Sequence, residues 1–303
     1  MSRKGNALDV NFFWFLLVVI HLAGAYVVSW TMRLLGVDSI RGGQYLVSSV
    51  LAIMEVVVMW GLIRGGRVLR KGLIPAHLLK PSEVIQGILL AILIYLISNY
   101  VNVISQLFFK NQMGDLLSGV EASGMLSFFS IALVPAFCEE FMFRGCIYHG
   151  VLQTEPGAKK KAVLVSAITF ALLHMNFNQM VYAFAAGLLM ALILTARDNI
   201  VFTMLIHFLF NSMTLLIILF QGKLTELGEK ASASDALRGV SASSLAPMTT
   251  AAVIALGLYL LIYWNLKRGR REESKTSKGH YRPDLIFLVG CVVCIVMACL
   301  VER

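Results

Sequence analysis

Long apolar runs recur along the whole chain and limit its possible folds more than any other feature of the sequence. A helix needs about 20 mainly apolar residues to cross the hydrocarbon core of a bilayer. Runs of about this length predict spans near residues 11–31, 45–63, 84–109, 125–152, 161–175, 179–196, 200–220, 247–266 and 284–301. The fifth run is short and the fourth is long, so eight to nine spans are expected. The chain is therefore predicted to be an all-α, polytopic transmembrane helix bundle.

The composition excludes the main soluble alternatives. Hydrophobic residues make up 58% of the 303 residues and charged residues 14%, whereas about 25% of residues are charged in typical globular domains. A soluble fold must keep its surface wetted and cannot hide this much apolar area. The runs are continuous and do not alternate, which argues against a transmembrane β-barrel. A soluble enzyme, a disordered chain and a disulfide scaffold are therefore not expected.

The basic residues predict how the chain is oriented in the membrane. Lysine and arginine are enriched in cytoplasmic loops. They gather here in 64–83, in 153–160 with the start of the next span, and in 267–283. These segments alternate with weakly charged ones along nine spans, so we expect a multi-pass protein of the cell membrane with its N-terminus in the cytoplasm and its C-terminus outside. The net charge of +9 belongs to these loops, and no basic face with interleaved aromatic residues indicates nucleic-acid binding.

The polar residues divide the chain into four segments. Residues 1–124 hold the first three spans, and 125–220 hold spans four to seven, which carry most of the buried ionisable groups. A polar external loop rich in serine and alanine is expected at 221–246, and 247–303 hold the last two spans with the basic loop 267–283. The first apolar run is long for the hydrophobic region of a signal peptide, so we expect it to remain as an uncleaved span.

The fourth span carries two adjacent carboxylates, Glu139 and Glu140. A charge at mid-bilayer costs about 2.5–3.5 kcal/mol on insertion scales, so each one needs a partner or a function. Glu140 and Arg144 share one helix face a turn apart, which suits an ion pair, while Glu139 is rotated by about 100° and points elsewhere. One acid can therefore be neutralised while its neighbour stays free for chemistry. A purely structural ion-pair cluster is the alternative.

Three further features accompany this carboxylate pair. Pro135 removes a helical hydrogen bond and exposes the carbonyl of Ile131, which predicts a kink, and kinked membrane helices line a cavity or the protein interior. His174 ends the fifth span, and His207 lies in the seventh with Asn211 one turn further along the same face. Counting helical rise puts Glu139 and His174 about 20 Å from the cytoplasmic ends of their spans, and His207 about 10–13 Å from its own. These groups meet in one cavity only if the seventh span is tilted.

These side chains suit the hydrolysis of an amide bond inside the membrane. A carboxylate beside a histidine can deprotonate water and later return the proton to a leaving amine. Asparagine and histidine can donate hydrogen bonds to a developing oxyanion. Glu139, His174 and His207 are also the residue types that hold a divalent metal such as zinc, although the chain has no H-E-x-x-H motif and no serine in a G-x-S-x-G setting.

The same residues resemble a known family. Glu139 to Arg144 reads E-E-F-M-F-R and is similar to the E-E-x-x-x-R motif of the CPBP family, which contains CAAX proteases and bacteriocin-processing enzymes. Residues 170–174 are similar to its F-x-x-x-H motif, and 207–211 to its H-x-x-x-N motif. Each motif is weak alone, but three in the right order on nearby spans are specific. The resemblance covers about 125–220.

The resemblance implies an intramembrane endopeptidase of the type II CAAX prenyl protease kind. In this family the residues that correspond to Glu139 and His174 are taken to activate water, and those that correspond to His207 and Asn211 to form the oxyanion site. Glu140 and Arg144 would support them. Family members are often called metalloproteases, so a metal held by Glu139, His174 and His207 stays open.

The expected substrate is a peptide or a membrane protein within the lipid bilayer, and a prenyl group on it is not implied. Two other kinds of function remain open. The first is a non-catalytic immunity or scaffold protein that keeps the buried network for folding. The second is a transporter whose carboxylates bind protons or cations.

Overall fold

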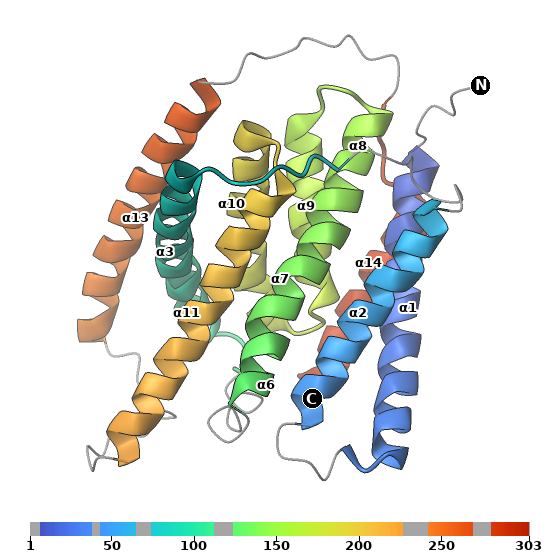
Figure 1. Ribbon diagram of the computed structural model, residues 1–303, viewed down its shortest axis with the longest axis horizontal. Helices are drawn as coiled ribbons and strands as arrows, with labels where there is room; N and C mark the ends of the chain where they lie inside the picture. The colour runs from blue at the N-terminus through green and yellow to red at the C-terminus, as the bar shows by residue number, and fades with distance from the viewer. Residues whose placement is uncertain are drawn as a thin grey trace.

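The computed structural model is a bundle of helices that run up and down its long direction (Figure 1). The structure describes residues 7–37, 43–64, 74–111, 124–226, 242–268 and 280–302. Within these ranges every regular element is a helix, which confirms the predicted all-α bundle. The basic residues of 65–73 and 269–279, and residues 227–241 of the predicted polar loop, lie outside the described residues.

The described part of the chain makes nine helical passes. They are α1 (Ala7–Leu34), α2 (Gly43–Arg64), α3 (Pro81–Ser105), a composite fourth pass (Met125–Thr154), α9 (Lys159–Leu173), α10 (Phe177–Arg197), α11 (Ile200–Glu226), α13 (Ala242–Arg268) and α14 (Leu285–Val301). Seven of them are long and apolar enough to cross a membrane. The other two are α9, with 15 residues, and α14, with 17. The prediction of about nine spans thus agrees with the helices. The fifth predicted run, 161–175, which is short in the sequence, corresponds to α9, the shortest of the nine passes.

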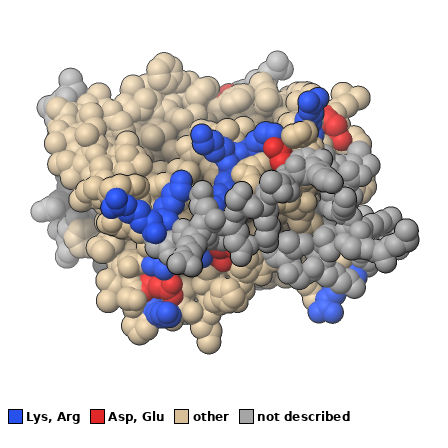
Figure 2. All heavy atoms as spheres, turned by 90° about the horizontal axis from the view of Figure 1, so that it is seen from above, with Lys and Arg blue, Asp and Glu red and all other residues tan. Residues whose placement is uncertain are grey.

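Successive passes alternate in direction, so the start of α1 and the end of α14 lie at opposite ends of the bundle (Figure 1). The end that holds the start of α1 also holds the α8–α9 turn at residues 155–158 and the end of α13. Lysine and arginine side chains gather on this face (Figure 2). The basic segments predicted to be cytoplasmic therefore reach one end of the molecule.

Two apolar clusters hold the bundle together, and α10 belongs to both. The first packs residues of α1, the fourth pass, α9 and α14 around aromatic side chains such as Trp14, Phe143 and Phe170. The second packs α3, α11 and α13 against the other face of α10, with Phe202 and Tyr259 fully buried. The helix α10 is consequently covered on most sides, and the motif residues lie on the helices around it.

Outside the spans, Glu155 ties three parts of the chain together. It follows the fourth pass and accepts hydrogen bonds from Lys161 Nζ at 2.7 Å and from the backbone N–H of Tyr281 at 2.8 Å. The Tyr281 hydroxyl in turn donates to Asn11 Oδ1 at 2.8 Å, and Asn11 Nδ2 donates to the carbonyl of Arg282 at 3.0 Å. The segment that leads into α14 is therefore fastened to α1 and to the α8–α9 turn.

This arrangement predicts an acid-sensitive contribution to stability. The hydrogen bond from Lys161, followed by that from Tyr281, holds the pKa of Glu155 below its usual value, which is about 4.3 for an unfolded chain. Because the folded pKa is the lower one, the stabilisation is present above about pH 4.3 and is lost as the pH falls through the folded pKa. Thermal unfolding of the purified protein between pH 7 and pH 3 measures this loss. Glu155→Gln should lower the melting temperature at pH 7 and flatten the acid side of the curve, and an acid side identical to that of the wild type would contradict the assignment.

Candidate active site

The fourth pass is not a regular α-helix. It contains α6 (Met125–Ser127), a π-helical segment η2 (Phe128–Leu133), α7 (Val134–Glu139), a second π-helical segment η3 (Glu140–Tyr148) and α8 (His149–Thr154). Pro135 lies in the first turn of α7, and the carbonyl of Ile131 accepts a hydrogen bond from Asn211 Nδ2 at 3.0 Å. The carbonyl predicted to be freed by the proline is thus satisfied by a residue of the third motif. π-Helical segments lie on both sides of α7, which holds Pro135, and such turns recur at functional sites.

Glu140 and Arg144 form the ion pair that their spacing predicted. Arg144 Nη1 donates to Glu140 Oε1 at 2.8 Å, and both side chains are fully buried. The same Glu140 oxygen lies 3.0 Å from His207 Nδ1, which donates to it. Arg144 Nη2 donates to the backbone carbonyl of Gly187 at 3.1 Å. The pair therefore links the fourth pass to α10 and α11.

The phenylalanine of the second motif packs against every other motif. The Phe170 ring lies 4.5 Å below the Arg144 guanidinium, and its edge-on contacts with the rings of His174 and His207 have centroid separations of 5.0 and 5.9 Å. A Cβ atom at Gly187 would lie 2.9 Å from this ring and 3.3 Å from Arg144. Only glycine lets α10 approach this closely. Sequence reasoning missed Gly187, although a glycine in mid-helix, which costs helix propensity, was a visible signal.

Glu139 has different surroundings from Glu140. Its Oε2 atom lies 3.7 Å from His207 Nε2, and 26% of its side chain is exposed, against none for Glu140. Since His207 donates from Nδ1 to Glu140, its Nε2 is the nitrogen on the side of Glu139. The predicted division of the two acids is therefore present, with one acid closed into an ion pair and the other open on one side.

His174 stands at the C-terminal end of α9 and is partly buried. Its Nδ1 atom lies 2.8 Å from the carbonyl of Phe170 and donates to it, because a carbonyl can only accept. In the neutral ring this contact leaves Nε2 with a free lone pair. Glu139 and His207 are both close enough to interact with His174 electrostatically. The residues of the three motifs are thus brought into one neighbourhood.

The motif residues of the fourth pass and of α11 lie at more similar depths in the bundle than the helical rise counted from the span ends predicted. The α10–α11 turn lies level with the start of α8, because Asp198 in that turn is 3.3 Å from His149 Nε2. Glu140 comes nine residues before His149, and His207 comes nine residues after Asp198. Two antiparallel helices in contact at one level meet again nine residues further along both. The expected mismatch of about 10 Å disappears for this reason.

The side chains do not form a ready metal site. The Nδ1 atoms of His174 and His207 contact Phe170 and Glu140, so only the Nε2 atom of each ring could bind a metal. Across the part of the chain that the structure describes, no three or more His, Cys, Asp or Glu side chains are grouped so that they would hold a metal ion. The structure therefore gives no three-ligand group made of Glu139, His174 and His207 within the described residues, and a metal held by these side chains stays a prediction.

A second buried acid–histidine pair lies in the first two passes. His21 Nδ1 is 2.7 Å from Glu55 Oε1, and the Glu55 side chain is 3% exposed. The helix α2 that carries Glu55 packs against α7. Sequence reasoning gave Glu55 no role. The signal in the sequence that could have predicted this pair is an acid without a partner in the second apolar run and a histidine in the first.

Comparison with known proteins agrees with the motifs. Residues 121–213 match the family model described as "Type II CAAX prenyl endopeptidase Rce1-like", and this range contains all three motifs. No curated protein and no solved structure matches the chain. The family match confirms the resemblance to the CPBP family that the motifs indicated.

Proposed function

We propose that this chain, a member of the CPBP family, hydrolyses a peptide bond of a peptide or membrane-protein substrate within the membrane. The observation that carries the proposal is the position of His207, whose two ring nitrogens lie 3.0 Å from Glu140 and 3.7 Å from Glu139. One of these acids is neutralised by Arg144, and the other is not. A transporter or a purely structural network gives no reason for this asymmetry.

In the first step Glu139 acts as the general base. Its partly exposed carboxylate and the free lone pair of His174 Nε2 orient a water molecule between them. The water oxygen adds to the carbonyl carbon of the scissile bond while its proton moves to Glu139. The carbonyl double bond becomes a single bond, and the oxygen takes the negative charge.

In the second step the oxyanion is stabilised and the peptide bond breaks. Asn211 uses one amide hydrogen for the Ile131 carbonyl, so its second amide hydrogen is available to the oxyanion. His207 donates from Nδ1 to Glu140, and a proton on its Nε2 would be donated to the oxyanion. The intermediate then collapses, the C–N bond breaks as Glu139 returns the proton to the leaving nitrogen, and the products are a carboxylic acid and an amine. The acid then passes its proton to the amine, which leaves a carboxylate and an ammonium group.

Glu140, Arg144 and Phe170 are positioning residues in this scheme. Glu140 fixes the orientation of the His207 ring, and Arg144 neutralises Glu140 without reaching Glu139 at hydrogen-bond distance. Phe170 separates the two histidines and supports the guanidinium. Glu140 and Arg144 are fully buried and bind each other, which suits a supporting role.

A peptide-library assay tests the proposal. The purified protein, incubated with peptides derived from a proteome, should release fragments with new amino termini, and mass spectrometry identifies the cleaved bond. Absence of cleavage in every lipid and detergent tested, combined with substrate flux into proteoliposomes, would favour the transporter instead.

Chelation gives a separate prediction. Because the described acids and histidines do not form a three-ligand group, cleavage should persist at the same rate after treatment with 1,10-phenanthroline or EDTA. Complete loss of cleavage that added zinc restores would overturn this expectation and return Glu139, His174 and His207 to the role of metal ligands.

We also propose that the start of α1 faces the cytoplasm and the end of α14 the exterior of the cell membrane. The basic residues at the end of the bundle that holds the start of α1 support this orientation (Figure 2), because positive residues are retained on the cytoplasmic side. Labelling of single cysteines placed at Lys80 and at Lys110, which lie at opposite ends of α3, distinguishes the two orientations.

A further inference from the structure

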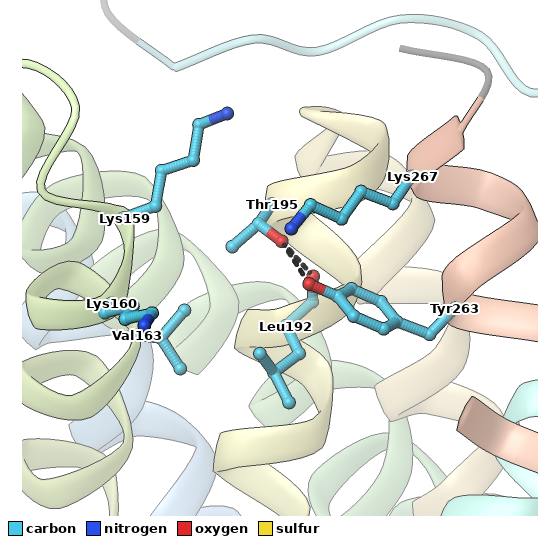
Figure 3. Close-up of a pocket in the computed structure, with 7 residues that line it drawn as sticks. All are labelled: Lys159, Lys160, Val163, Leu192, Thr195, Tyr263 and Lys267. Atoms are coloured by element: carbon cyan, nitrogen blue, oxygen red, sulfur yellow. Dashed lines mark hydrogen bonds between the residues drawn. The ribbon is translucent and has the colours of Figure 1, made fainter. Parts of the chain in front are cut away.

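A cavity of about 150 Å³ opens between α9, α10 and α13 at the basic end of the bundle (Figure 3). It has room for several water molecules, since about 10–15 Å³ of such volume holds one. The residues that line it come from three helices and are Lys159, Lys160, Val163, Leu192, Thr195, Tyr263 and Lys267. Lys159 and His174 stand at opposite ends of α9, so this cavity is separate from the candidate active site.

The charged residues that line this cavity are all lysines. Three lysines line it and no acid does, and the neighbouring Lys161 already pairs with Glu155 at 2.7 Å. Within the described residues, neither Lys160 nor Lys267 has an ion pair or a side-chain hydrogen bond. The first turn of α9 contains no acidic residue, so the positive end of the helix dipole adds to the lysines. Lysines of α9 and α13 thus line the same cavity, and no acidic residue of the lining balances their charge.

Besides the lysines, the lining of the cavity contains two hydroxyl groups and two apolar side chains. Thr195 Oγ1 and the Tyr263 hydroxyl lie 3.3 Å apart, and Figure 3 shows Lys267 reaching toward this pair from α13. Val163 and Leu192 line the cavity without polar groups. The Thr195 hydroxyl donates to the carbonyl of Leu192 at 2.7 Å, so the Tyr263 hydroxyl donates to Thr195. The ammonium groups are therefore the donors that remain for the oxygen atoms of a phosphate group.

An apolar groove continues from the cavity along α13. It is lined by Gly257, Leu260, Leu261, Tyr263 and Trp264, and Tyr263 lines the cavity as well. Leu260 and Leu261 are half exposed. A Cβ atom at Gly257 would have no atom within 4 Å. The groove therefore has room for a hydrocarbon chain, on a helix apolar enough to face lipid.

We propose that the cavity and groove together bind one anionic phospholipid. Its phosphate lies among Lys159, Lys160 and Lys267, and an acyl chain lies along α13 at Gly257. Basic pockets between transmembrane helices on the cytoplasmic side bind anionic head groups, and the basic end of this bundle has such a pocket. A water-soluble phosphate would fill only the lysine end, whereas a phospholipid uses both parts. This inference does not depend on the proposed peptidase activity.

Native mass spectrometry of the delipidated full chain in detergent tests the proposal. Phosphatidylglycerol should bind at least 10-fold more tightly than phosphatidylcholine with the same acyl chains. The double variant Lys160→Gln/Lys267→Gln should bind phosphatidylglycerol about 30-fold more weakly, which corresponds to about 1 kcal/mol for each lysine near an anionic surface. Its affinity for phosphatidylcholine should not change.

Three comparisons make the result specific. Lys160→Arg/Lys267→Arg should retain the affinity, since it keeps both charges. Lys80→Gln removes an exposed lysine at the same end of the bundle but outside the cavity, and should change the affinity less than twofold. Gly257→Leu fills the groove and should weaken binding of the diacyl lipid several-fold.

Four results would overturn the proposal. These are wild-type affinity in the double glutamine variant, an equal loss in Lys80→Gln, wild-type affinity in Gly257→Leu, and competition by glycerol phosphate as effective as that by the lipid. The last result would assign the site to a soluble phosphate. Because the Gly257→Leu measurement keeps all three lysines, it still tests the site if the glutamine pair fails to fold.

Discussion

Glu139→Gln is expected to abolish cleavage while the bundle stays folded and inserted. The substitution keeps the size of the side chain and removes the general base, a role that contributes about 10²–10⁴-fold to rate. Glu139 is partly exposed, and its nearest described charged partner is His207 Nε2 at 3.7 Å, beyond hydrogen-bond distance. Its loss should therefore cost little folding free energy. Initial rates on the cleaved peptide, together with the melting temperature of the same preparation, measure both parts of this expectation.

His174→Ala should give the same loss of cleavage, because it removes the second group that orients water. Glu155→Gln is the matched control for Glu139→Gln, since it makes the same chemical change at an acid outside the spans and should leave the rate unaltered. Cleavage that survives both Glu139→Ala and His174→Ala would show that the catalytic assignment is wrong. A cellular phenotype that survives Glu139→Gln at normal expression would favour the non-catalytic immunity or scaffold protein.

The parts of this site that sequence could predict are those that depend on one helix. The pairing of Glu140 with Arg144 follows from a spacing of four residues, and the free carbonyl of Ile131 follows from the chemistry of Pro135 four residues later. Both are present in the structure. The apolar runs likewise predicted the passes, because a span is set by length and hydropathy alone.

The parts that sequence could not predict depend on how helices are placed against one another. Gly187 matters because Phe170 and Arg144 pack onto it from other passes. His207 reaches Glu140 because the α10–α11 turn lies level with the start of α8, and counting residues within one span does not give the level of that turn. The pairing of His21 with Glu55 joins two helices in the same way. Each of these contacts is set by tertiary packing, which single-helix geometry does not describe.

Glu140 should behave in the opposite way to its neighbour. Glu140→Gln removes a charge that Arg144 and His207 both contact, and it leaves the fully buried Arg144 without an anionic partner at hydrogen-bond distance. Breaking a buried ion pair by removing one partner costs about 3–5 kcal/mol, because an uncompensated charge remains. Unfolding in detergent, followed by helical circular dichroism, should show a large loss of stability in Glu140→Gln and in Arg144→Met.

A double-mutant cycle separates this effect from simple loss of packing. In Glu140→Gln/Arg144→Met no unpaired charge of the pair remains, so the double variant should be clearly more stable than the sum of the two single losses predicts. Additive losses would show that the two side chains act independently and that their hydrogen bond at 2.8 Å contributes little. Because Glu139 lacks such a partner, Glu139→Gln combined with Arg144→Met should be close to additive in stability. The loss of the partly exposed Glu139 would then affect mainly the reaction, whereas the loss of the fully buried Glu140 would affect mainly the stability of the fold.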